Sequence, residues 1–449
     1  MNAKLKKHIP MIITLLLILL FSTACTAQKL QGTQRVSLAS NESQADNRSK
    51  TPSISADGRY VTFASDATNL VAKDINGVTD IFVRDLRKGT TTRLSVSNIG
   101  IEGNQASTWP FISADGRYVA FNSDADNLVD NDMNGFGDVF LHDRNTGKIE
   151  LISVSMDGIS GNDLSFWSSV SSDGRYVVFM SQANNLVPSD TNESWDIFVR
   201  DRKTGVTKLI SNAYDGSQAN SQSEYPVISA DGRYVAFASD ATNLVEGDTN
   251  GYRDVFEVDQ QTGKITRVSV SSDGTQTDNG TQQFSLSISA DGRYIAFQSL
   301  ATNLIADDTN ASWDIFVHDR DTAETTRVSV TSNGMQADAG SYGVAISPDG
   351  RYVAFGSNAT NLVPEDTNGV MDVFVHDRQT GQTSRVSVSS DGAQANETSG
   401  FTLIAPAGID LAYGPLITLD GSTVIFMSNA TNLVVGDTNS NQDIFMHTR

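Results

Sequence analysis

Short apolar runs alternate with polar turn sequences along most of this chain, and the same order of runs and turns recurs seven times. Each unit holds four runs rich in Val, Ile, Phe, Tyr and Thr, residues that favour half-buried β-strands. In the second unit the predicted strands cover residues 109–113, 117–123, 138–142 and 148–155. Short Asp, Asn and Gly sequences after the first and third strands are typical of hairpin turns. Beyond the first 24 residues no segment keeps a helical period, so we expect little helix.

An Asp-Gly pair marks each unit and returns every 58 to 71 residues. A period of this length indicates a repeat architecture. Seven copies of a four-stranded antiparallel unit predict an all-β, seven-bladed β-propeller. A solenoid is the main alternative, but solenoids use shorter units and need distinct end caps. The marker aspartates are Asp57, Asp115, Asp173, Asp231, Asp291, Asp349 and Asp420.

The two ends of the repeat region are complementary. The last unit stops after its third strand, at residues 443–449, and lacks a fourth. Residues 34–38, ahead of the first unit, match the fourth-strand sequence at residues 266–270. We therefore expect the N-terminal segment to complete the last blade. A ring closed in this way has no exposed sheet edges that invite aggregation.

The repeated phrase resembles a known family. Its form is I-S-x-D-G-R-Y-V-A-F followed by a D-[IV]-[FY]-V strand, which is similar to the TolB-type, WD-like β-propeller repeat of bacterial envelope proteins. The resemblance covers residues 34–449 and implies the propeller fold, but propellers perform many unrelated tasks. TolB itself carries a separate α/β domain before its propeller, and we expect none here. The role of TolB in envelope assembly is therefore not transferred to this chain.

Residues 1–24 have the features of an export signal. Three lysines precede an apolar stretch at residues 9–21, and small residues follow at 22–24. The only cysteine of the chain, Cys25, comes next. This arrangement resembles a bacterial lipoprotein signal, although Ser22 stands where Leu is usual, and the resemblance implies lipidation of Cys25. Ordinary signal cleavage is the alternative interpretation.

These features predict a signal peptide at residues 1–24, a linker at 25–33 and a propeller at 34–449. The protein would be exported to the cell envelope, in the periplasm or at the outer surface, with a lipid anchor as its only link to a membrane. The formal net charge of −21 argues against a nucleic-acid partner. It favours cationic partners, metal ions or simple solubility. We expect a monomer that binds an envelope protein, a peptide or a glycan.

All seven units carry an Asp-x-Asn-x-x-x-Asp loop between the second and third strands. Oxygen ligands at alternate positions of a tight loop suit Ca²⁺, with backbone carbonyls and water completing the coordination. The alternative is purely structural, because Asp and Asn also bond to nearby backbone N–H groups in turns. The candidate metal ligands are Asp74, Asn76 and Asp80; Asp132, Asn134 and Asp138; Asp190, Asn192 and Asp196; Asp248, Asn250 and Asp254; Asp308, Asn310 and Asp314; Asp366, Asn368 and Asp372; and Asp437, Asn439 and Asp443.

Aromatic residues recur just ahead of most Asp-Gly pairs. In a propeller the link between blades shares a face with the loop between the second and third strands, so these residues would gather around one mouth of the channel. Flat side chains there would stack a sugar ring or grip a peptide; alternatively they cap the core between blades. The candidate ligand-binding residues are Trp109, Trp167, Tyr225, Phe284, Tyr342 and Tyr413, together with Trp195 and Trp313 inside the polar loops. An apolar insertion at residues 401–413 is expected on the same face, as a cover, a partner contact or a loop folded onto the ring.

The sequence offers little for catalysis. Four of the five histidines, His142, His318, His376 and His447, occupy the same position of the third strand, and no G-x-S-x-G nucleophile motif occurs. We therefore expect a non-catalytic binding or scaffold protein, with weak Ca²⁺ binding in the loops and no other cofactor. The alternative is a carboxylate-based glycoside hydrolase or lyase at the channel mouth, because paired acids leave no short sequence signature.

Overall fold

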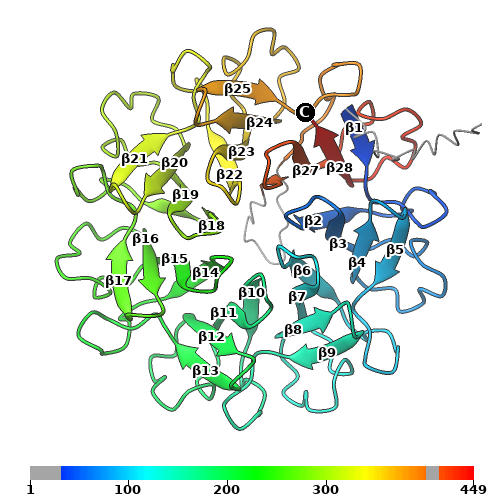
Figure 1. Cartoon of the computed structure of the whole chain (residues 1–449), viewed down its shortest axis with the longest axis vertical. Coiled ribbons are helices and arrows are strands. Elements are labelled where there is room, and N and C mark those ends of the chain that lie inside the picture. The colour runs from blue at the N-terminus through cyan, green and yellow to red at the C-terminus, as the bar shows by residue number, and fades with distance from the viewer. Residues whose placement is uncertain (1–31, 401–413) are drawn as a thin grey trace, which may run out of the picture. The chain divides into compact units, whose positions relative to one another are not determined.

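A computed structural model describes residues 32–400 and 414–449. The described chain is all β: seven four-stranded antiparallel sheets stand as blades around a central channel (Figure 1). The propeller predicted from the repeat is confirmed. Among the described residues no helix has the length and apolar character needed to cross a membrane. The predicted signal peptide, Cys25 and the insertion at 401–413 lie outside the described residues.

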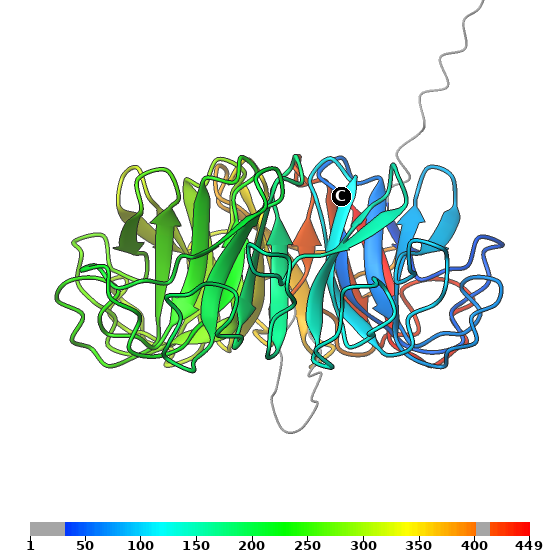
Figure 2. The same cartoon turned by 90° about the horizontal axis from the view of Figure 1, so that it is seen from below.

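Every blade contributes one strand to each of four concentric positions, and the blades lie side by side in a single layer (Figure 2). The innermost strands are β2 (Ser49–Ile54), β6 (Ser107–Ile112), β10 (Ser165–Val170), β14 (Ser223–Ile228), β18 (Thr281–Ile288), β22 (Ser341–Ile346) and β26 (Leu416–Ile417). The second strands are β3 (Tyr60–Ser65), β7 (Tyr118–Ser123), β11 (Tyr176–Ser181), β15 (Tyr234–Ser239), β19 (Tyr294–Ser299), β23 (Tyr352–Ser357) and β27 (Thr423–Ser428).

The third strands are β4 (Asp80–Asp85), β8 (Asp138–Asp143), β12 (Asp196–Asp201), β16 (Asp254–Asp259), β20 (Asp314–Asp319), β24 (Asp372–Asp377) and β28 (Asp443–Thr448). The outermost strands are β5 (Thr90–Arg93), β9 (Lys148–Leu151), β13 (Val206–Leu209), β17 (Lys264–Arg267), β21 (Glu324–Arg327), β25 (Gln382–Arg385) and, for the last blade, β1 (Gly32–Arg35).

The N-terminal strand closes the ring as the sequence predicts. Strand β1 pairs antiparallel with β28, from Gly32 opposite Thr448 to Arg35 opposite Phe445. The Ser37 hydroxyl donates to Asp443 across the closure at 2.6 Å. In the other blades the same bond joins residues of one continuous chain segment, as from Ser211 to Asp196. Pairing begins at Gly32, two residues ahead of the predicted propeller start.

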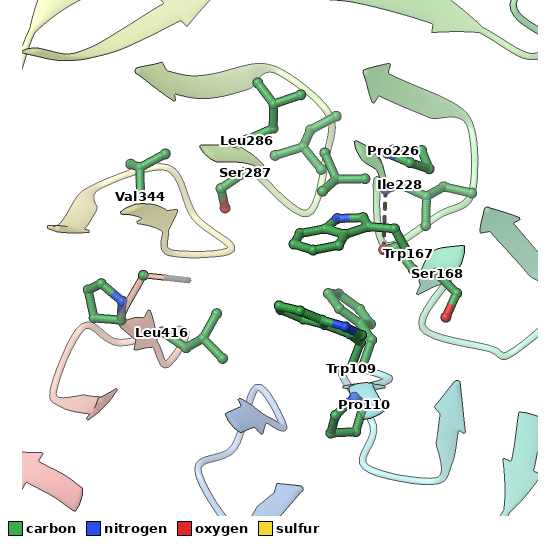
Figure 3. A pocket seen from close by; sticks show the side chains of 16 residues that line it. Trp109, Pro110, Trp167, Ser168, Pro226, Ile228, Leu286, Ser287, Val344 and Leu416 are labelled. Carbon is green, nitrogen blue, oxygen red and sulfur yellow. Dashed lines mark hydrogen bonds between the residues drawn. The ribbon is translucent and has the colours of Figure 1, made fainter. Parts of the chain in front are cut away.

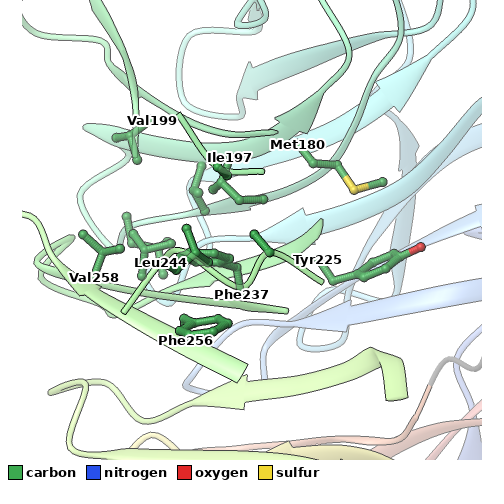
Figure 4. Close-up of a cluster of buried hydrophobic side chains, with 13 residues drawn as sticks. Met180, Ile197, Val199, Tyr225, Phe237, Leu244, Phe256 and Val258 are labelled. Carbon is green, nitrogen blue, oxygen red and sulfur yellow. The ribbon is translucent and has the colours of Figure 1, made fainter. Parts of the chain in front are cut away.

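The hydrophobic core lies between blades. Each blade has one phenylalanine on its second strand and one on its third, as in Phe237 and Phe256, with ring centroids 5.8 to 6.1 Å apart. In Figure 4 this pair packs against Ile197 and Val199 of the preceding blade. Burying one such phenylalanine contributes about 1.5–3 kcal/mol. The repeated apolar side chains therefore pack both within their own blade and against the neighbouring blade.

The Asp-Gly-Arg-Tyr sequence joins consecutive blades at the turn between the first and second strands. Arg175 donates two hydrogen bonds to Asp201 of its own blade, at 3.0 and 2.8 Å, and its guanidinium lies 4.6 Å from the ring centre of Tyr176. The Asp-Gly turn of the next blade packs on that tyrosine, so a Cβ at Gly232 would overlap the ring. The glycine–tyrosine contact recurs at six of the seven blade interfaces, which explains why the four residues are repeated together. At the seventh interface Gly58 meets Thr418, because the last blade has Ser422 and Thr423 in place of Arg and Tyr.

We predict that Gly232→Ala destabilises the fold more than Gly247→Ala. Both glycines have left-handed backbones, with φ of +75° and +76°, but a Cβ at Gly247 meets nothing within 4 Å. Left-handed strain alone costs about 1–2 kcal/mol, and the overlap with Tyr176 adds a further ~1–3 kcal/mol. Denaturant unfolding of the two variants measures the difference. Equal losses of unfolding free energy would show that the turn does not pack on the tyrosine.

Acid should weaken the arginine–aspartate pairs. The hydrogen bonds from the arginine lower the pKa of Asp201, Asp259 and Asp319 to about 2 each, below the value of about 3.9 expected for an unfolded chain. A lowered folded-state pKa contributes stability above the unfolded value, and that stability is lost as the pH falls from about 4 towards 2. We therefore expect the difference in melting temperature between the natural protein and Arg175→Gln to shrink over this range. A difference that stays constant with pH would contradict the pairing.

Candidate functional site

A cavity of about 150 Å³ opens in the central channel, between the innermost strands. Residues from the second to the seventh blade line it, and the two tryptophans lie together on one side in Figure 3. The lining residues are Trp109, Pro110, Phe111, Trp167, Ser168, Ser169, Pro226, Val227, Ile228, Leu286, Ser287, Ile288, Val344, Gly414, Pro415 and Leu416.

A β-bulge in the innermost strands turns three predicted aromatics towards one another. Trp109, Trp167 and Tyr225 have left-handed backbones, with φ of 55°, 51° and 58°, and the pairing with the second strand shifts register around them. Bulges commonly re-aim a side chain, and such backbones are uncommon for bulky residues. The ring centroids of the two tryptophans are 4.8 Å apart, and Tyr225 meets Trp167 edge-on at 5.0 Å.

Serine hydroxyls supply the polar groups of the cavity. Ser287 accepts a hydrogen bond from the backbone N–H of Ile346 at 3.0 Å. Ser169 accepts one from Ile228 at 3.4 Å, drawn as the dashed line in Figure 3. Both bonds tie one innermost strand to the next. The hydroxyl of Ser168 is buried without a hydrogen-bond partner among the described residues, which leaves a donor and acceptor for a ligand. None of the described side chains that line the cavity ionises near neutral pH.

The structure brings together only part of the predicted aromatic set. Trp109, Trp167 and Tyr225 meet, but they lie within the innermost strands rather than in the link before them. Trp195 and Trp313 do not line the cavity; they precede β12 and β20, and their carbonyls accept hydrogen bonds from the next blade at 2.7 and 2.8 Å.

The other predicted aromatics do not add to the cavity wall. Tyr342, one position before the bulge, is absent from the lining. The side chain of Phe284 and the whole of Tyr413 lie outside the described residues. Sequence reasoning missed Ser168, and its place directly after the bulge aromatic was the signal that could have identified it.

The Asp-x-Asn-x-x-x-Asp loops form hydrogen-bonded networks. In every blade the last aspartate is fully buried. It accepts a bond from a serine hydroxyl two residues after the fourth strand, as Asp196 does from Ser211 at 2.6 Å. The asparagine amide donates to the carbonyl of a residue in the following link, as from Asn310 to Ala337 at 3.0 Å. Among the described residues no three His, Cys, Asp or Glu side chains lie close enough to hold a metal together. Turn structure therefore has direct support, and metal binding stays a prediction.

An arginine from the outermost strand enters five of the seven loops. In the first blade Arg93 contacts Asp74 at 3.2 Å and Asp80 at 3.0 Å, and Arg267, Arg327, Arg385 and Arg35 do the same in four others. The second and third blades carry leucine at this position. Burial there raises the pKa of Asp138 to about 7 and that of Asp196 to about 6.

Three of the four third-strand histidines contact a threonine hydroxyl of the fourth strand. The Nδ1 atoms of His318 and His376 lie 2.9 Å from the hydroxyls of Thr325 and Thr383. Arg84 occupies the same position in the first blade and bonds to Thr91. Burial lowers the pKa of His142 to about 4. The predicted role of these histidines as a repeat position agrees with this geometry.

Solved structures of other propellers resemble this chain, while no protein-family model and no curated protein matches its sequence. An oligogalacturonate lyase from Vibrio parahaemolyticus aligns with a TM-score of 0.55 at 14% identity, over 93% of this chain and 97% of the lyase. The β-propeller domain of the Trilobed protease from Pyrococcus furiosus aligns with a TM-score of 0.51 at 11% identity, over 89% of this chain and 95% of that domain. TolB from Acinetobacter baumannii aligns with a TM-score of 0.40 at 14% identity, over 88% of this chain and 81% of TolB. The lyase and protease alignments, with TM-scores above 0.5 at 14% and 11% identity, establish the propeller fold alone.

Proposed function

We propose that this protein is a non-catalytic binding protein of the cell envelope whose channel cavity takes an uncharged, ring-sized group of a glycan or a peptide. The observation that carries the proposal is the cavity lining: two tryptophans in mutual contact, further apolar side chains and a serine hydroxyl with no hydrogen-bond partner among residues 32–400 and 414–449.

The size of the cavity limits what it can hold. An apolar cavity of about 150 Å³ accepts a benzene-sized ring, and the volume here is similar. An oligosaccharide would therefore insert only one sugar ring, and a folded partner only one side chain. Tryptophan offers a broad flat surface for such a ring, and the Ser168 hydroxyl would fix its orientation through a hydrogen bond.

The lining residues that the structure describes include no ionisable side chain, and this supports binding without chemistry. General acid–base catalysis needs a titratable group within hydrogen-bond reach of the reacting atoms, and the lining residues supply none. A charged ligand would also lack a counter-charge there, and burying an unpaired charge is costly. A neutral group fits this cavity best.

A carboxylate-based enzyme is the second candidate, because one buried acid lies close to the bulge. Glu224 directly precedes Tyr225 on β14, and burial raises its pKa. However, Arg253 contacts both Glu224, at 2.7 Å, and Asp240. This ion pairing favours a structural role for both carboxylates.

We predict that Trp167→Ala weakens ligand binding at least tenfold, because loss of one stacked ring costs about 1.4 kcal/mol or more. Titration of envelope glycan fragments and short peptides, followed by tryptophan fluorescence, measures the affinity. Trp313→Ala is the matched control, since Trp313 does not line the cavity, and it should bind as the natural protein does. Unchanged binding by Trp167→Ala would remove the cavity as the site.

The same ligands separate binding from turnover. Incubation with the natural protein should leave every glycan and peptide intact by mass spectrometry. Cleavage that disappears in Glu224→Gln, with folding retained, would replace the binding proposal by the enzyme alternative.

Export and anchoring give a separate prediction. If Cys25 is the lipidated residue, cells that express the protein should incorporate labelled fatty acid into it and carry it in the membrane fraction. Cys25→Ser should abolish the label and release the protein from that fraction. Labelling that persists in Cys25→Ser would contradict the anchor.

A further inference from the structure

The polar loop of the second blade differs from the other six in what lies between its two aspartates. In five blades a single guanidinium group bridges them. It reaches Oδ1 of the first aspartate at 2.6 to 3.5 Å and Oδ2 of the last at 3.0 to 3.5 Å. Each of these buried carboxylate pairs therefore has an internal cation.

The third blade lacks the arginine but has a substitute. Leu209 takes the arginine position, and the side-chain amide of Gln218 enters instead. Its Nε2 donates to Asp190 at 2.7 Å and reaches Asp196 at 3.4 Å. In the fourth blade, where Arg267 is present, the equivalent Gln276 bonds to the Gly247 carbonyl instead. The glutamine thus moves between the carboxylates only where the arginine is missing.

The second blade has neither group. Leu151 pairs with Phe140 in the register in which Arg93 pairs with Phe82, and Ser160 stands at the position of Gln218. Asp132 is 7% exposed, and its Oδ1 is buried with no hydrogen-bond partner among the described residues. This is the same atom that contacts the arginine in the five other blades.

We propose that the second blade binds an external hard divalent cation, Ca²⁺ in the first place, between Oδ1 of Asp132 and Oδ2 of Asp138. The cation occupies the position that the guanidinium group has in the sister blades. The proposal is independent of ligand binding in the channel cavity, and it restricts the cation-binding prediction to one loop of the seven.

The ligand set explains the choice of cation. Both donors are carboxylate oxygens, which hard cations prefer, and two negative charges match one divalent ion. Ca²⁺ accepts irregular oxygen sets completed by carbonyls and water, whereas Mg²⁺ demands near-octahedral geometry. Asp138 is already held by Ser153, whose hydroxyl donates to Oδ1 at 2.5 Å, and by the Asn134 amide at Oδ2. A prepositioned carboxylate lowers the ordering cost of binding.

Calorimetric titration of chelator-treated protein with CaCl₂ tests the proposal. We expect one site per chain, with a dissociation constant on the order of 10⁻⁴ to 10⁻³ M, as in extracellular modules. At ten times that concentration the folding equilibrium constant should rise about tenfold, seen as a higher melting temperature. Leu151→Arg supplies the sister-blade guanidinium and should abolish both effects. Leu209→Arg, in the blade where Gln218 already bridges the pair, is the matched control and should leave both unchanged.

Asp132→Asn keeps the test decisive if Leu151→Arg does not fold. This variant removes one charged ligand and should weaken Ca²⁺ binding at least tenfold. Absence of heat and of a melting shift at about 10 mM Ca²⁺ would overturn the proposal and leave a proton shared between the two carboxyl groups. Binding retained in both Leu151→Arg and Asp132→Asn would overturn it as well, because the cation would then lie elsewhere.

Discussion

The phenylalanine pair of each blade is buried only because the neighbouring blade covers it. The rest of the structure depends on this packing between blades. The seven hydrophobic clusters lie at the seven interfaces between blades. One of them joins Ile444 of the last blade to Phe63 and Phe82 of the first. A blade at an open end would expose this surface to water. Closure by β1 therefore stabilises the last blade through its strand pairing and every blade through the continuity of the core.

A shared interface also accounts for the repeated phrase. Each unit has to present the same surface to the unit before it and the complementary surface to the unit after it. The glycine and the tyrosine of Asp-Gly-Arg-Tyr serve opposite sides of one interface, as Gly232 and Tyr176 show. The arginine holds its own third strand through Asp201. A substitution at any of these residues would disturb the packing of two blades at once.

Departures from the phrase are informative for the same reason. The bulge position tolerates threonine in the first blade and glycine in the sixth, with left-handed backbones at Thr51 and Gly343, so the fold does not require an aromatic there. Trp109 and Trp167 at this position instead create the apolar wall of the cavity. Leu151 likewise removes a charge that five sister blades keep. A specific function is best sought at positions where one or two blades lack the residue that the other blades share.

The sequence by itself determined the number of blades, their four strands and the closure of the ring. These follow from periodicity and from pairing between near neighbours in the chain. The fourth-strand sequence at residues 34–38 matches the one unit that lacks a fourth strand, and it pairs there with β28. Only the tertiary structure decided the content of the candidate sites. Trp109 and Trp167 are 58 residues apart, and their contact depends on a bulge that a hydrophobic pattern does not encode. The aspartate loops were equally compatible with a cation or a turn. The arginine that bridges the two aspartates in five of them comes from an adjacent strand, at a position set by register and twist.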